Sequence, residues 1–142
     1  MSDVSARAFL DRLFSAAVAA AHPSTCLPPA LPPPPAHGRL ILLAAGKAAG
    51  SMLEVAEKHY LDELGFPSER LAGIGVARHG YGRPTRLLEM VEAGHPVPDA
   101  AGLAAAQKAI DLAASATADD LVLVLLSGGA SANWIAPAEG VE

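Results

Sequence analysis

Two uninterrupted apolar runs of six residues constrain the fold of this chain most: Leu40 to Ala45 (LILLAA) and Leu121 to Leu126 (LVLVLL). A strand with one face toward water alternates apolar and polar residues, whereas a continuous apolar run is typical of a strand buried on both faces. Burial of that kind occurs in parallel sheets that are covered by helices on both sides. We therefore expect both runs to be strands of an α/β sheet.

The segments between these runs alternate between helical and extended patterns. Helical spacing predicts helices over 48–64 and 100–116, and shorter apolar segments predict strands over 71–77 and 87–93. The expected buried faces of the two helices carry Met52, Leu53, Ala56, Tyr60 and Leu64 in the first and Leu103, Ala106, Ile110 and Ala113 in the second. Strands separated by helices imply crossover connections, and hence an open, mostly parallel, Rossmann-like sheet with flanking helices.

Three zones divide the chain. Residues 1–21 are expected to form an N-terminal helix, with a packed apolar face, that ends before Pro23 because the residue preceding a proline disfavours helix. Residues 22–38 hold seven of the twelve prolines and predict an extended, semi-rigid connector. Residues 39–142 contain the α/β pattern. The apolar stretch at 13–21 could alternatively be the core of a signal peptide, although acidic residues precede it.

Composition excludes several classes of function. The net charge is −5 and the chain has no basic run, which disfavours nucleic acid and anionic membranes as partners. The single cysteine, Cys26, rules out an internal disulfide and a cysteine-based zinc cluster. It is consistent with a reducing compartment, and we expect a cytoplasmic location. No apolar run has the length of a membrane span.

Two of the expected strands end in residues suited to anions. Gly46 and Lys47 follow the first apolar run at the start of a helix, where a cation is unfavourable unless a negative group lies nearby. Ser127-Gly128-Gly129-Ala130-Ser131 follows the second run, and its glycines allow a ligand to approach backbone N–H groups closely. The loop matches neither a P-loop nor a G-x-G-x-x-G fingerprint. The alternative for Lys47 is a lysine that reaches into solvent, and the alternative for the 127–131 loop is an ordinary tight turn between a strand and a helix.

A third candidate is the loop Gly94-His95-Pro96-Val97-Pro98-Asp99, which two prolines stiffen. His95 could donate a hydrogen bond to a ligand or act as an acid or base, or it could only brace the loop. We expect Asp99 to cap the following helix. Arg78, at the end of the second strand, could contact an anion or lie free at the surface. No cluster of acidic residues and histidines has metal-ligand spacing, so a metal would arrive with a nucleotide.

Three segments together resemble the N-terminal domain of type II glycerate kinases, the glycerate 2-kinases of the MOFRL family, which are often labelled hydroxypyruvate reductases. They are AAGKAAGSM (44–52), EAGHPVPDAAG (92–102) and LVLLSGGASA (123–132). The resemblance implies ATP-dependent phosphorylation of D-glycerate to 2-phosphoglycerate with Mg²⁺, in a cleft between this domain and a second one.

The resemblance also implies roles for individual residues. Lys47 matches the lysine of the family's G-K-A motif, an active-site cation, and Ser127, Gly128, Gly129 and Ser131 match a loop expected to hold phosphate or substrate. His95 matches the histidine of G-H-P-V-P-D. Arg78 matches an arginine of a T-R-Y-G-like segment, from which this chain departs with Ala77-Arg78-His79-Gly80.

Family members are much longer, so the resemblance implies a truncated domain that lacks its C-terminal partner and is inactive alone. Two other readings stay open: a hydroxypyruvate reductase, and a non-catalytic α/β module that binds a small anion.

Overall fold

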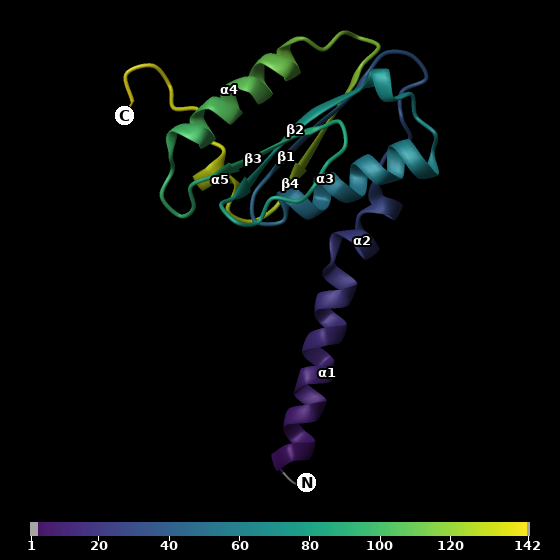
Figure 1. Ribbon diagram of the computed structural model, residues 1–142, viewed down its shortest axis with the longest axis vertical. Helices are drawn as coiled ribbons and strands as arrows, with labels where there is room; N and C mark the ends of the chain where they lie inside the picture. Colours follow the sequence, from purple (N-terminus) through teal and green to yellow (C-terminus); the bar gives the residue numbers. More distant parts are fainter. Residues whose placement is uncertain (1–2, 142) are drawn as a thin grey trace.

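The computed structural model describes residues 3–141 and shows a four-stranded parallel sheet with a helix against each face (Figure 1). The strand order is β3-β2-β1-β4, and all three pairings are parallel. The strands are β1 (Leu40–Ala45), β2 (Leu71–Arg78), β3 (Glu89–Ala93) and β4 (Leu121–Leu126). The expected open parallel α/β architecture is confirmed, and the two six-residue runs are neighbouring strands. The expected burial on both faces is wrong for β4, which lies at the edge of the sheet and leaves Val124 and Leu126 45% and 61% exposed.

Helices connect the strands, and most of their bounds agree with the prediction. The α-helices are α1 (Asp3–Ala21), α2 (Pro23–Cys26), α3 (Ala49–Lys58), α4 (Ala100–Ala114) and α5 (Ala130–Asn133). Short 3₁₀ turns cover Pro28–Ala30 and Ser68–Arg70, and a π-helical turn over His59–Glu63 extends α3. In the proline-rich segment between α1 and β1, the expected extended conformation is wrong for Pro23–Cys26 and Pro28–Ala30, which form two short helical turns.

The core lies on both faces of the sheet, and β1 is buried along its whole length. Leu40, Leu42 and Ala44 point to the face covered by α3, while Ile41 and Leu43 point to the face covered by α4. This alternation of side chains between two covered faces is the physical reason for the continuous apolar run in β1.

The expected buried faces of the two long helices need correction. Leu103 and Ile110 are 45% and 46% exposed, whereas Ala106 is buried as expected. Helix α4 packs through Ala106 together with Gly102, Ala105 and Ala109. Small side chains allow α4 to lie close to its neighbours: a Cβ added to Gly102 would lie 2.9 Å from the carbonyl oxygen of Asn133. Leu64 is also exposed, because the π-helical turn after α3 rotates it off the buried face.

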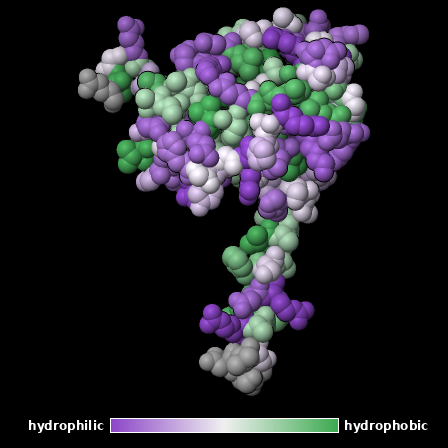
Figure 2. Space-filling model, viewed as in Figure 1, coloured by the Kyte–Doolittle hydropathy of each residue, from purple (hydrophilic) through white to green (hydrophobic). Residues whose placement is uncertain are grey.

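Helix α1 was expected to be packed, and this prediction is wrong for the part of the chain that the structure describes. The helix projects away from the sheet domain, and its main contacts are with α2 (Figures 1 and 2). Its apolar stripe, formed by Phe9, Leu10, Leu13, Phe14 and Val18, is therefore exposed. Within residues 3–141, no helix combines the length and the hydropathy that crossing a bilayer requires.

Candidate functional site

The candidate site lies where β1 and β4 end side by side. The chain leaves β1 through α3 on one face of the sheet, and it reaches β4 from β3 through α4 on the other face. The direction of winding therefore changes between β1 and β4. In open parallel sheets, ligands bind outside the carboxyl ends of the strands at such a change.

Hydrogen bonds lock the two loops at this point together. The N–H of Lys47 donates to the carbonyl oxygen of Gly128 at 3.0 Å, and the N–H of Ala48 donates to Oγ of Ser127 at 2.9 Å. Gly46 has a φ of 108°, and a Cβ there would lie 2.5 Å from the same Oγ, so this close approach requires glycine. The N–H groups of Lys47 and Ala48, just before α3, are thus occupied by the 127–131 loop, and the Ser127 hydroxyl braces the two loops. Among residues 3–141, no hydrogen bond uses the N–H groups of Gly50 and Ser51 in the first turn of α3.

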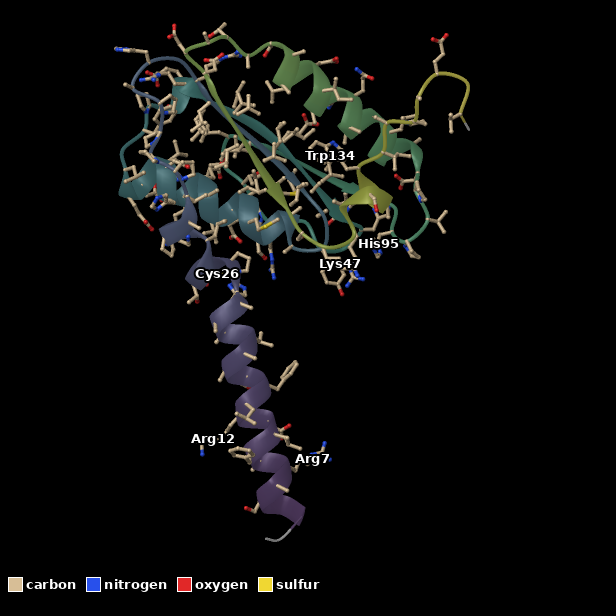
Figure 3. The ribbon with its side chains drawn as sticks, turned by 180° about the vertical axis from the view of Figure 1, so that it is seen from behind. Arg7, Arg12, Cys26, Lys47, His95 and Trp134 are labelled. Atoms are coloured by element: carbon tan, nitrogen blue, oxygen red, sulfur yellow. The ribbon has the colours of Figure 1, made fainter. Side chains whose placement is uncertain are left out.

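Lys47 and His95 converge on Gly129. A Cβ added to Gly129, whose φ is 91°, would lie 2.8 Å from Nε2 of His95 and 3.3 Å from Cε of Lys47. Figure 3 shows both side chains at the same end of the sheet, although they follow strands that are not neighbours. Lys47 is exposed and His95 is half-buried. Within residues 3–141, no hydrogen bond uses the N–H groups of Gly128 and Gly129.

This arrangement suits an oxyanion. An ammonium group and an imidazole supply a positive charge and a ring N–H, and two free backbone N–H groups lie in the same loop. A cation beside unpaired N–H groups is unfavourable by itself and becomes favourable when a negative group lies between them.

Two other predicted residues, Arg78 and Ser131, make no hydrogen bond or ion pair to this cluster among residues 3–141. The guanidinium of Arg78 stacks over the ring of Tyr81, with 3.5 Å between its Cζ and the ring centroid. Its Nε is buried and has no hydrogen-bond partner among the described residues. Ser131 is exposed on α5. Across residues 3–141, no hydrogen bond or ion pair joins either residue to Lys47 or His95.

Two residues at this end of the sheet, His79 and Glu92, were not among the predicted site residues, although both join neighbouring loops. Nε2 of His79 lies 2.9 Å from Oδ2 of Asp99. The carboxylate of Glu92 accepts hydrogen bonds from the N–H groups of Gly80 and Gly82 at 3.0 and 2.8 Å, which lowers the pKa of Glu92. The available signal was a carboxylate near the end of β3, beside two glycines that follow β2.

Comparison with known proteins supports a single family. Residues 9–142 match the family described as Domain of unknown function (DUF4147). A protein from Agrobacterium vitis, provisionally named hydroxypyruvate reductase, is 39% identical over 136 residues, which are 96% of this chain and 30% of that protein. A glycerate 2-kinase from Pyrococcus horikoshii is 35% identical over 105 residues, which are 74% of this chain and 22% of that protein.

The same relationship holds in three dimensions. The crystal structure of a glycerate kinase from Thermotoga maritima superposes on this chain with a TM-score of 0.76 at 30% identity. The superposition covers 97% of this chain and 32% of that one, so the chain spans about a third or less of the length of these relatives. The chain therefore belongs to the DUF4147 family, the N-terminal domain of type II glycerate kinases.

Proposed function

We propose that this chain is the anion-holding part of a glycerate 2-kinase, which transfers a phosphoryl group from ATP to D-glycerate and releases 2-phosphoglycerate. One observation carries the proposal: Lys47 and His95 both approach Gly129 at the change of winding between β1 and β4, and the N–H groups of Gly128 and Gly129 make no hydrogen bond among residues 3–141. The names of the relatives supply the substrate class.

In this proposal the protein acts by positioning and by charge. Phosphoryl transfer spreads negative charge over the transferred oxygens, and catalysis comes mainly from groups that are already in place to stabilise it. Lys47 supplies a positive charge, and the N–H groups of Gly128 and Gly129 donate hydrogen bonds. His95 donates to an oxygen of the bound anion. Gly46 and Ser127 hold the two loops in register, and Arg78 and Ser131 are the next candidates for substrate contact.

ATP supplies the phosphoryl group, and Mg²⁺ neutralises part of its charge. Residues 3–141 contain no group of three or more His, Cys, Asp or Glu side chains that could hold a metal ion. The donors at the site are cationic or N–H groups, which suit phosphate oxygens rather than a metal. We therefore propose that Mg²⁺ is bound through the nucleotide and through residues of the remaining domain, and that the reaction takes place in the cytoplasm.

The cluster on this chain is only part of such a site. Effective phosphoryl transfer requires both substrates to be held in line by several groups at once. We therefore propose that the 142-residue chain binds anions but does not turn over glycerate by itself, and that the domain which follows in the relatives completes the cleft. Formation of 2-phosphoglycerate by the isolated chain at an ordinary enzyme rate would contradict this.

Binding of inorganic phosphate and of D-glycerate tests the site directly. Titrations followed by amide NMR should move the resonances of Gly128 and Gly129, and Lys47→Ala should weaken the binding by about fivefold or more, as expected when a charged hydrogen bond is lost. Lys58→Ala is the matched control, because Lys58 is an exposed lysine in the last turn of α3. Equal affinities for the two variants would refute the role of Lys47.

The name of the Agrobacterium vitis relative supports a second candidate, a hydroxypyruvate reductase. Oxidation of NADH in the presence of hydroxypyruvate, measured with the full-length relative and compared with ATP-dependent phosphorylation of glycerate, separates the two reactions. If anions bind but neither reaction is supported even when the chain is joined to the region that follows this domain in the relatives, the chain is a non-catalytic anion-binding module.

A further inference from the structure

The carboxylate of Asp99 contacts more than the helix that it caps. Its Oδ1 accepts a hydrogen bond from the N–H of Gly102 in the first turn of α4, at 2.9 Å. Its Oδ2 lies 2.9 Å from Nε2 of His79, in the loop after β2. Gly94, the first residue after β3, packs against the same carboxylate: a Cβ there would lie 3.2 Å from Oδ2. One side chain therefore joins the ends of two strands to the start of a helix.

The pKa of Asp99 reflects the same surroundings. The hydrogen bond from Gly102 lowers it most, the hydrogen bond from His79 comes next, and the N–H of Gly94 adds to them; together they lower the pKa from 3.8 to about 2. A helix cap needs only one of the two carboxylate oxygens. The second oxygen, Oδ2, is therefore available for its contacts with His79 and Gly94.

The loop held in this way carries His95. Its prolines, Pro96 and Pro98, have no N–H and cannot anchor it through backbone donors. The loop also closes tightly, since the carbonyl oxygen of Val97 lies 2.3 Å from the place where a Gly94 Cβ would stand. Asp99 forms one end of this loop, and its carboxylate contacts Gly94 at the other end, so it joins the two ends between which His95 lies.

We infer that Asp99 is a positioning residue, which holds His95 against Gly129 and beside Lys47 through Gly94 and His79. The inference rests on the proposed function only in so far as this cluster binds an anion; the placement of His95 can be tested without any ligand.

Asp99→Ser separates positioning from capping. Serine is as good a helix cap as aspartate, but its single short hydroxyl does not span His79 and Gly102 together. The urea midpoint should therefore stay close to that of the wild type. The ring resonances of His95 and the amide resonances of Gly94 and Gly129 should shift in ligand-free ¹⁵N spectra. The dissociation constant for inorganic phosphate should rise by about fivefold, the equivalent of one net hydrogen bond.

Three further variants sharpen the test. Asp99→Asn keeps the cap and one carbonyl acceptor, so it should restore part of the wild-type spectrum. His79→Ala leaves the cap intact and should move the same His95 and Gly94 resonances. Asp111→Ser alters an exposed carboxylate on the same helix and should move neither.

The inference is overturned if, in both Asp99→Ser and His79→Ala, the resonances of His95, Gly94 and Gly129 superpose on those of the wild type. If wild-type protein fails to bind phosphate or glycerate, the proposed function fails, but the ligand-free spectra still decide whether Asp99 positions His95.

Discussion

His95 and Lys47 approach Gly129 so closely that the methyl group added in Gly129→Ala should displace them. In Gly129→Ala, the new Cβ would lie 2.8 Å from Nε2 of His95, about 0.6 Å inside the 3.4 Å at which ordinary van der Waals contact begins. The ring must move away, and Cε of Lys47, at 3.3 Å, is crowded as well. The φ of 91° adds a backbone cost of about 1–2 kcal/mol for any residue with a Cβ.

Gly65→Ala is a matched control for the backbone cost. Gly65 also has a positive φ, 63°, but nothing lies within 4 Å of its added Cβ. Gly65→Ala should therefore lose about 1–2 kcal/mol of unfolding free energy in urea titrations followed by circular dichroism, and Gly129→Ala should lose more, because displacement of the His95 ring adds to the same backbone cost. Only Gly129→Ala should shift the ring resonances of His95 and weaken phosphate binding. If the two variants bind phosphate equally well, the convergence on Gly129 does not form a binding surface.

Two further predictions concern stability. Glu57 is buried and accepts hydrogen bonds from the N–H groups of Arg86, Leu87 and Leu88 at 2.8, 2.9 and 3.0 Å. Glu57→Ala should therefore lower the free energy of unfolding in urea by about 3 kcal/mol. Glu54→Ala, an exposed change on the same helix, should lower it by less than about 0.5 kcal/mol, and equal losses in the two variants would contradict this account. Hydrogen bonds from Arg39 lower the pKa of Asp120, so the stability that Asp120 contributes is present above about pH 4 and is lost as the pH falls further. Asp120→Asn should flatten the urea midpoint against pH below that value, and an unchanged acid limb would refute the assignment.

The sheet and its helices could be predicted because local pattern and burial agree along most of the chain. The continuous apolar run of β1 is covered on both faces, and Asp99 caps α4 as its position before an apolar helix indicated. The equally apolar run of β4 lies at the sheet edge and is partly exposed, so the run predicts a strand but not its burial. The buried face of α4 could not be predicted. Hydrophobicity alone favours Leu103 and Ile110, but the distance between helix and sheet selects alanine and glycine instead.

The candidate site was predictable in part. Lys47 and the 127–131 loop follow strands that had to be parallel, so their meeting at one edge was expected. Which groups remain free for a ligand was not. The hydroxyl of Ser127 accepts a hydrogen bond from the N–H of Ala48, whereas the N–H groups of Gly128 and Gly129 make no hydrogen bond among residues 3–141. Such pairing depends on atoms about 80 residues apart in sequence, which no local pattern encodes.

By itself, the sequence determined the strands, the helices, the parallel sheet and the residues at the strand ends, because periodicity and turn residues act over short distances. Only the tertiary structure decided that α1 stands clear of the domain, that His95 reaches Gly129 from a strand on the far side of the sheet, and that the Asp99 carboxylate contacts both His79 and Gly94. Those outcomes depend on the order of the strands and on distances between segments that are remote in sequence. Both are set by tertiary packing, not by local sequence patterns.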